Sequence, residues 1–326
     1  MRWATGRPGA YTPKTPQASF GWLTGPCSRN AGGGNGHTPL AFAGLIDLHT
    51  HSTVSDGSDP PGRIPELAAA AGCRAVALTD HDRLDGLAEA AARADELGVV
   101  LIPGCELSCG FGEHSLHLLV YFLEPGAGPL QEELVNLQQA RHDRNLALAE
   151  RLGELGLPCT LEDMEEESGG TGTGRPHAAA VLVRKGVVGS VHEAFEQWLA
   201  VGRPGYVESH RMEVPHALAL ARGSGAVPVL AHPFSLDLEE AELETVVAEL
   251  ASMGLGGLES VYGRYSPDER QALTALARRH DLVPTGGSDH HGTYKPDLRV
   301  GVGRGDLEVP DEVLDDLAAR RPSSAA

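Results

Sequence analysis

The chain has 326 residues, 41% of them hydrophobic, which suffices for one large α/β domain with or without an inserted segment. Its formal net charge of −19 argues against a protein held to nucleic acid by a broad basic face, but not against a nucleotide ligand, because bound divalent cations would invert the local field. The 5 cysteines form no Cys-x-x-Cys pair, and no apolar run suits a membrane helix or signal peptide. We therefore expect a cytoplasmic protein.

The order of apolar runs predicts the organisation of the chain. Residues 1–43 are rich in Gly, Pro, Thr, Ser and Asn without periodicity, which predicts a disordered N-terminal extension. Over 44–125 and 206–305, short apolar runs alternate with Ala-rich amphipathic segments, a pattern typical of βαβ units in a parallel sheet or barrel. We expect strands at 45–49, 75–80, 99–104, 117–122, 227–231, 257–262, 282–286 and 299–302, and helices at 62–71, 84–97, 240–253 and 267–280.

Residues 126–205 break this alternation. They hold a long charged amphipathic segment at 130–155, an acidic stretch that ends in the Gly-rich run 169–174, and two shorter helical segments. We expect a helical insert domain here, and a C-terminal helix and tail over 306–326.

Possible metal ligands stand at the ends of the expected strands. His49 and His51 share one face of an alternating strand, and Asp56 follows in the next loop. In a parallel barrel the carboxyl ends of the strands share one rim, so side chains far apart in sequence converge there. The full set is too large for one ion and suits two or three, as in enzymes of phosphoryl transfer. It comprises His49, His51, Asp56, His81, Glu106, His117, His232, Asp289 and His291.

Each of these residues also has an ordinary structural interpretation. The histidines at 49 and 51 could lie on the surface, Asp80 or Asp82 could cap a helix, and His232 could be a satisfied core residue. Cys105 and Cys109, which flank the glutamate at 106, are more simply explained as small buried residues. The repeated placement at strand ends favours the metal-binding hypothesis.

Several motifs together resemble one family. Asp47-Leu48-His49-Thr50-His51-Ser52 with Ser55-Asp56-Gly57, Thr79-Asp80-His81-Asp82, Gly104-x-Glu106-Leu107-Ser108, Ala231-His232-Pro233 and Gly287-Ser288-Asp289-x-His291 resemble the PHP (polymerase and histidinol phosphatase) metallophosphoesterases. The resemblance covers residues 45–304. Arg175-Pro176-His177 and the following run 178–186 resemble the branch that dephosphorylates nucleoside 3′,5′-bisphosphates, whose members also trim RNA from its 5′ end.

The resemblance implies a distorted (β/α)7 barrel with a helical insert and two or three divalent ions, Mn²⁺, Fe²⁺ or Zn²⁺, at its rim. His49, His51, Glu106 and Asp289 would hold the first ion; Glu106 would bridge to a second, completed by His117 and His232; Asp56, His81 and His291 would hold a third. Members commonly have Leu-Gly after the histidine of the fourth strand, whereas this chain has Leu118-Leu119. His114 competes for that role, but strand alternation turns it to the opposite face from His117.

The implied reaction is hydrolysis of phosphate monoesters of nucleotides, and of 5′ ends of short RNA, by a metal-bridging hydroxide that attacks phosphorus in line. Arg175 and His177 would bind a phosphate, and Arg264 is a weaker candidate for this role. Equally, Arg175 could be an ordinary charged loop residue and His177 could cap a helix. Histidinol-phosphate phosphatase and a non-catalytic metal-binding module are the alternative functions. We expect no duplex nucleic acid, membrane or protein partner.

Overall fold

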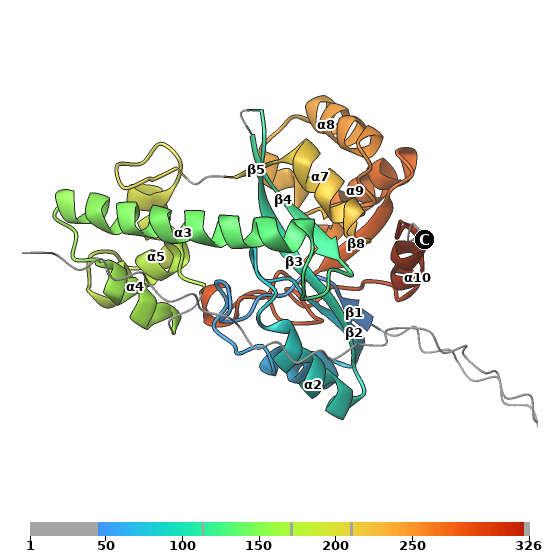
Figure 1. The fold of residues 1–326 in the computed structure, drawn as a ribbon, viewed down its shortest axis with the longest axis horizontal. Helices are drawn as coiled ribbons and strands as arrows, with labels where there is room; N and C mark the ends of the chain where they lie inside the picture. Colours follow the sequence, from blue (N-terminus) through green and yellow to red (C-terminus); the bar gives the residue numbers. More distant parts are fainter. Residues whose placement is uncertain (1–44, 113, 170–171, 209–210, 323–326) are drawn as a thin grey trace, which may run out of the picture. The chain divides into compact units, whose positions relative to one another are not determined.

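The computed structural model describes residues 45–322 except 113, 170–171 and 209–210, so the expected extension 1–43 lies outside the described residues. Figure 1 labels most of the elements. The elements in chain order are β1 (Leu45–Asp47), α1 (Arg63–Ala71), β2 (Cys73–Leu78), α2 (Leu87–Leu97), β3 (Val100–Phe111), β4 (His114–Tyr121), α3 (Pro129–Glu154), α4 (Leu161–Ser168), α5 (Arg175–Arg184), α6 (Val191–Ala194), the π-helical turn η1 (Phe195–Leu199), β5 (Met212–Glu213), α7 (Val214–Gly223), β6 (Val227–Leu230), η2 (Pro233–Leu236), α8 (Glu240–Ser252), β7 (Gly257–Tyr262), α9 (Pro267–Arg279), β8 (Val283–Gly287), η3 (Gly292–Tyr294) and α10 (Glu312–Ala319).

The strands form a nearly closed barrel. Their order is β1-β2-β3-β4-β6-β7-β8, and β5 pairs with β3 outside this path. β8 returns to β1, where the Leu48 amide donates to the Gly286 carbonyl at 3.2 Å and Thr50 forms a parallel bridge with His290. The predicted distorted seven-stranded α/β barrel is confirmed.

One strand runs against the others, so the sheet is mixed rather than parallel as expected. β4 is antiparallel to both β3 and β6, while the other neighbours on the path are parallel. The reversal follows from a short turn in which Gly112 has a φ of 58°, a backbone conformation suited to glycine. The first half of β4 therefore lies at the same rim as the carboxyl ends of the parallel strands, and His117 pairs with Ser108 near the end of β3.

The expected strand at 299–302 is wrong. This segment is a turn in which Arg299 bridges back to Gly303, and Gly301 and Gly303 have φ values of 69° and 54°. The Gly301 amide donates to Asp47 Oδ2 at 2.7 Å, which holds the turn against β1 instead of extending the sheet. Helix α7 was not anticipated.

Alternation along the strands separates two cores. Side chains such as Ile46, Leu119 and Val229 pack inside the barrel together with Val313 and Leu317 of α10. The opposite strand faces pack under the outer helices. Cys105 and Cys109 are fully buried in this outer core, as the structural interpretation expects, and burial raises their thiol pKa values. Among the described residues, no helix is both long and apolar enough to cross a membrane.

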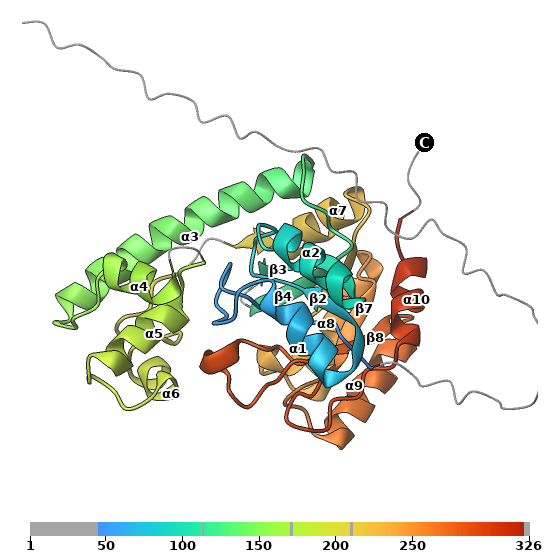
Figure 2. The same ribbon diagram turned by 90° about the horizontal axis from the view of Figure 1, so that it is seen from below.

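The segment 126–205, which we call the cap, has a core of its own. Leu148 and Leu152 of α3 pack there against α4, α5 and η1. The first half of the same helix contributes Leu130, Leu134 and Leu137 to the outer barrel core. Figures 1 and 2 show α3, in green, running from the barrel to α4 and α5. The insert-domain boundaries remain a prediction.

Candidate metal centre and substrate pocket

Close packing of glycine places the first two histidines. An added Cβ on Gly287 of β8 would stand 2.4 Å from His49 Cβ and 2.5 Å from its backbone nitrogen. A Cβ on Gly57 would stand 2.6 Å from the His51 carbonyl oxygen. Glycine at both positions lets β8 and the loop after β1 lie directly against the His49-x-His51 strand end.

His49 and His51 face the same point in space. Their Nε2 atoms are 3.1 Å apart. Glu106 Oε2 lies 3.4 Å from the first and 3.1 Å from the second, and Asp289 Oδ1 lies 3.5 Å from both. A tetrahedral ion with bonds of about 2.1 Å needs ligand atoms about 3.4 Å apart, so this spacing fits one ion.

The hydrogen bonds behind these rings fix their lone pairs. His49 Nδ1 donates to the carboxylate of Glu259 at 2.9 Å, so in the neutral ring the lone pair is on Nε2. Ser55 Oγ gives its proton to Asp80 Oδ1 at 2.6 Å and so accepts from His51 Nδ1 at 3.3 Å. With both rings neutral, two imidazole lone pairs and two carboxylate oxygens converge on one point. A cation is the group that this arrangement suits.

The other oxygen of Glu106 faces a second pair of imidazoles. Oε1 is 2.9 Å from His117 Nδ1 and 2.9 Å from His232 Nε2. His117 is thus turned toward the centre, whereas His114 is exposed. The glutamate has one oxygen in each group, the geometry of a bridging carboxylate.

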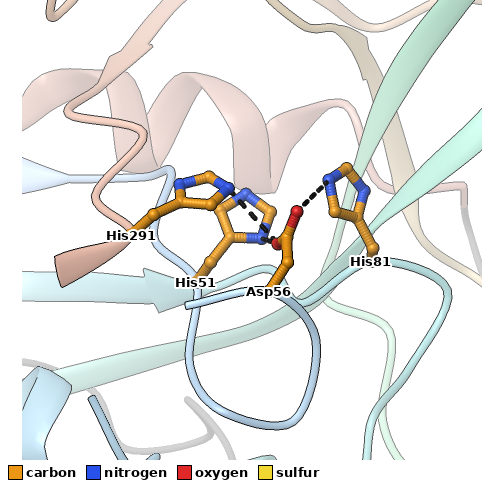
Figure 3. A group of neighbouring side chains, drawn as sticks. All are labelled: His51, Asp56, His81 and His291. Carbon is orange, nitrogen blue, oxygen red and sulfur yellow. Dashed lines mark ion pairs between the residues drawn. The ribbon is translucent and has the colours of Figure 1, made fainter. Parts of the chain in front are cut away.

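Asp56 gathers the remaining histidines. Its carboxylate lies 3.3 Å from His291 Nε2, 3.7 Å from His81 Nε2 and 3.6 Å from His51 Nδ1. Figure 3 shows Asp56 between these rings. His81 Nδ1 lies 3.3 Å from Glu106 Oε2 and is buried without a hydrogen-bond partner in the described chain, which suits a metal ligand.

The groups of candidate metal ligands overlap. Potential ligand atoms of His51, Asp56, His81 and His291 lie within 4.8 Å of one another, as do those of His49, His51 and Glu106, and those of His81, Glu106 and His117. Geometry therefore brings all the expected ligands to one rim, while the division among three ions remains the one that the family resemblance implies.

The carboxylates of the centre are held ionised. Burial alone would raise the pKa of Glu106, but His81, His117 and His49 outweigh it and hold that pKa well below its usual range. For Asp56, burial is likewise outweighed by His291 and His81. Asp289 and His232 also have positive φ values of 57° and 26°, a strain typical of functional sites.

Supporting residues that were not predicted to serve the site surround this centre. Glu259 also accepts from the His232 amide at 2.7 Å, and Asp80 accepts from the Ser52 amide at 2.8 Å. Tyr262 Oη and Lys295 Nζ donate to Asp289 Oδ2 at 2.7 and 2.5 Å. The buried glutamate within the apolar run of β7 was the sequence signal for the first of these.

The three expected substrate residues have different positions. Arg175, at the start of α5, lines the pocket next to the centre and lies over the ring of Tyr206. His177 is buried, and its Nδ1 accepts from the Gly174 amide at 3.0 Å, which is the capping role named above as the alternative. Arg264 is exposed and pairs with Asp297 at 3.0 Å rather than joining the centre.

The pocket, of about 290 Å³, joins the metal centre to the cap. Candidate ligands of the barrel, such as Asp56 and Glu106, line it together with Arg141, Arg144, Arg175, Val191 and Phe195 of the segment 126–205. The sequence analysis missed Arg141 and Arg144 although a signal was present. Arg141 and Arg144 interrupt the apolar stripe of α3, whose leucines are Leu130, Leu134, Leu137, Leu148 and Leu152.

The barrel and its rim of imidazoles and carboxylates define the chain as a metal-binding hydrolase of the α/β-barrel class. The PHP domain model matches residues 47–197. The chain is 32% identical over 257 residues to the 3′,5′-nucleoside bisphosphate phosphatase of Chromobacterium violaceum, covering 78% of this chain and 90% of that one. It is 32% identical over 252 residues to the 5′-3′ exoribonuclease Rnm of Escherichia coli, covering 77% and 86%.

A solved structure shows the same architecture. A metal-dependent phosphoesterase of Bifidobacterium adolescentis superposes with a TM-score of 0.76 at 30% identity, covering 86% of this chain and 98% of that one. The chain belongs to the PHP family. It is a hydrolytic phosphoesterase, as predicted.

Proposed function

We propose that the protein removes a phosphate from nucleoside 3′,5′-bisphosphates, with the candidate ligands named above holding two or three divalent ions. One observation carries this proposal: the pocket is lined both by candidate metal ligands of the barrel and by three arginines of the cap. A substrate with two separated phosphates matches both kinds of lining. The relatives named for the bisphosphatase and exoribonuclease activities support the same substrate class.

Divalent ions at such a centre supply a water of lowered pKa and neutralise the phosphoryl oxygens. The protein's own residues orient and enclose the substrate. Glu259 orients His49 through a direct hydrogen bond, and Asp80 orients His51 through Ser55 Oγ. Arg175 is placed to donate to a phosphate. Val191 and Phe195 offer an apolar surface to the rest of the nucleotide.

A second candidate, trimming of short RNA from its 5′ end, is favoured by a second cavity. This space of about 120 Å³ also reaches Asp56, His81 and Arg141, and continues to Gln138 and His142. The centre thus opens on two sides, which suits a chain that continues beyond the reacting phosphate.

We infer a cytoplasmic location, because Cys73, Cys105, Cys109 and Cys159 are free thiols.

The test is phosphate release with added Mn²⁺ from 3′,5′-bisphosphoadenosine, 5′-phosphorylated short RNA and histidinol phosphate. We expect a preference for the nucleotides that is lost in His49→Ala and Asp289→Ala. The matched control is His192→Ala in the cap, because this histidine is 82% exposed. Release from histidinol phosphate alone would overturn the proposal in favour of amino-acid metabolism. No release from any substrate by metal-loaded protein would overturn it as well.

A further inference from the structure

The two carboxylate oxygens of Asp289 have different surroundings. Oδ1 faces the centre and lies 3.5 Å from Nε2 of both His49 and His51. Oδ2 instead accepts two hydrogen bonds from side chains that are not candidate ligands. One oxygen of this carboxylate is therefore open to an ion, and the other is already engaged.

The two donors to Oδ2 are Tyr262 and Lys295. Tyr262, the last residue of β7, is 8% exposed and donates from Oη at 2.7 Å, while its ring packs against Tyr265 with 4.8 Å between the ring centroids. Lys295 follows η3, lines the pocket and donates from Nζ at 2.5 Å. Because the donors come from different elements, each holds Oδ2 independently of the other.

Lysine is rare in this chain, which has 3 lysines among its 26 basic residues. At position 295 the choice between lysine and arginine matters, because an arginine fork tends to bind both oxygens of a carboxylate, whereas a single ammonium donates to one. Lys295 thus compensates part of the charge of Asp289 without competing for Oδ1.

Coordination through a single carboxylate oxygen favours some ions over others. Ca²⁺ takes about 6–8 oxygen ligands and often binds a carboxylate through both oxygens, whereas transition ions accept fewer ligands and bind imidazole nitrogens well. Glu106 has one oxygen in each of two groups of histidines, and Asp289 offers only Oδ1. Neither carboxylate is then free to bind one ion through both of its oxygens.

We propose that Tyr262 and Lys295 are positioning residues that determine metal selectivity. By holding Oδ2 of Asp289, they restrict this carboxylate to coordination through one oxygen and so disfavour Ca²⁺ relative to Mn²⁺. The proposal rests on the metal binding in the proposed function and deepens it, because it assigns the choice of ion to two side chains that act through Asp289.

The test is the ratio of Kd for Ca²⁺ to Kd for Mn²⁺, measured by calorimetry on protein first stripped of metal by chelation. Loss of the Lys295 charge alone would tighten the binding of both divalent ions by a similar factor, so the ratio reports the freedom of Oδ2. We expect Tyr262→Phe and Lys295→Met each to lower the ratio. The double variant should lower it about 10- to 100-fold, the effect typical of partners that orient a metal ligand.

Two matched controls should keep the wild-type ratio. Lys185→Met removes a lysine of the cap whose side chain is 29% exposed, against 30% for Lys295, and which pairs with Asp163. Tyr265→Phe removes the hydroxyl of the neighbouring tyrosine, which accepts from the Phe234 amide at 3.0 Å. Neither control alters a contact of a candidate ligand.

An unchanged ratio in the double variant, or an equal drop in the controls, would overturn the proposal. Because Tyr262→Phe keeps the buried ring, its ratio decides the question by itself if Lys295→Met does not fold. A wild type that prefers Ca²⁺ or binds neither ion would also overturn it. If the wild type prefers Mn²⁺ and the double variant loses this preference, but no bisphosphate is hydrolysed, the proposed function fails while the metal selectivity stands.

Discussion

Glu259 is a buried carboxylate that orients two candidate ligands from behind. One oxygen accepts from His49 Nδ1, and the other accepts from the His232 amide. In Glu259→Gln an amide donor would face one of these two donors, so one hydrogen bond is lost and His49 is free to turn. We expect metal affinity to fall about 10- to 100-fold, as is typical for partners that orient a ligand. Metal titration by calorimetry measures this.

The control for this substitution is Glu244→Gln, which alters an exposed ion pair with Arg279. It should leave metal affinity unchanged, since exposed surface ion pairs contribute little to the stability of the fold. Equal affinities for wild type and Glu259→Gln would show that His49 is held by packing alone.

At the residue scale, the candidate ligands were readable from sequence because strand alternation and strand ends restrict where a side chain points. His117 lies with the other candidate ligands although its strand runs in the opposite direction to its neighbours, since reversal brings the start of β4 to the rim. Arg144 was not found although it interrupts the apolar stripe of α3, because the stripe does not show that this helix face meets a cavity. Helix length and charge alone do not contain that information.

At the scale of elements, the contact between β8 and β1 is governed by Gly287. Gly287→Ala would press a methyl group onto the His49 backbone, which cannot move aside as a flexible side chain could. We expect a loss of about 1–3 kcal/mol in the free energy of unfolding, together with weaker metal binding. Urea denaturation and metal analysis of the same samples measure both.

Gly153→Ala provides the comparison, because this α3 glycine has nothing within 4 Å of an added Cβ. The free energy of unfolding of this variant should rise by about 0.5–1 kcal/mol, because alanine reduces the conformational freedom of the unfolded chain. If Gly287→Ala were as stable as this control and bound metal normally, the close approach of β8 to β1 would not be what positions His49.

Most elements were predictable because apolar runs and glycine stops mark them locally. Helix α2, for example, ends at Gly98 with a φ of 68°. The direction of β4 and the turn at 299–303 were not predictable in this way. The first depends on the local turn at Gly112, whose strand-reversing geometry the apolar pattern does not mark, and the second on a contact distant in sequence, that between Gly301 and Asp47.

At the scale of the whole molecule, the metal centre should couple to stability. The rim buries several carboxylates and imidazoles together, so ions that bind only the folded state stabilise it. At a free ion concentration 1,000 times Kd this amounts to about 4 kcal/mol. We expect chelation to lower the melting temperature by several degrees, and added Mn²⁺ to restore it.

In the His49→Ala variant, chelation should change the melting temperature less than in wild type. A wild-type melting temperature that is indifferent to complete metal removal would contradict the coupling between ions and fold.

Helix α3 links three environments in succession: the outer barrel core at Leu134, the pocket at Arg144, and the cap core at Leu152. A single uninterrupted helix of 26 residues does not act as a hinge, and the residues from 45 on form one compact unit. Opening and closing of the cap by a hinge within this helix is therefore not expected as a step of turnover, and small-angle scattering profiles with and without bound nucleotide should superimpose.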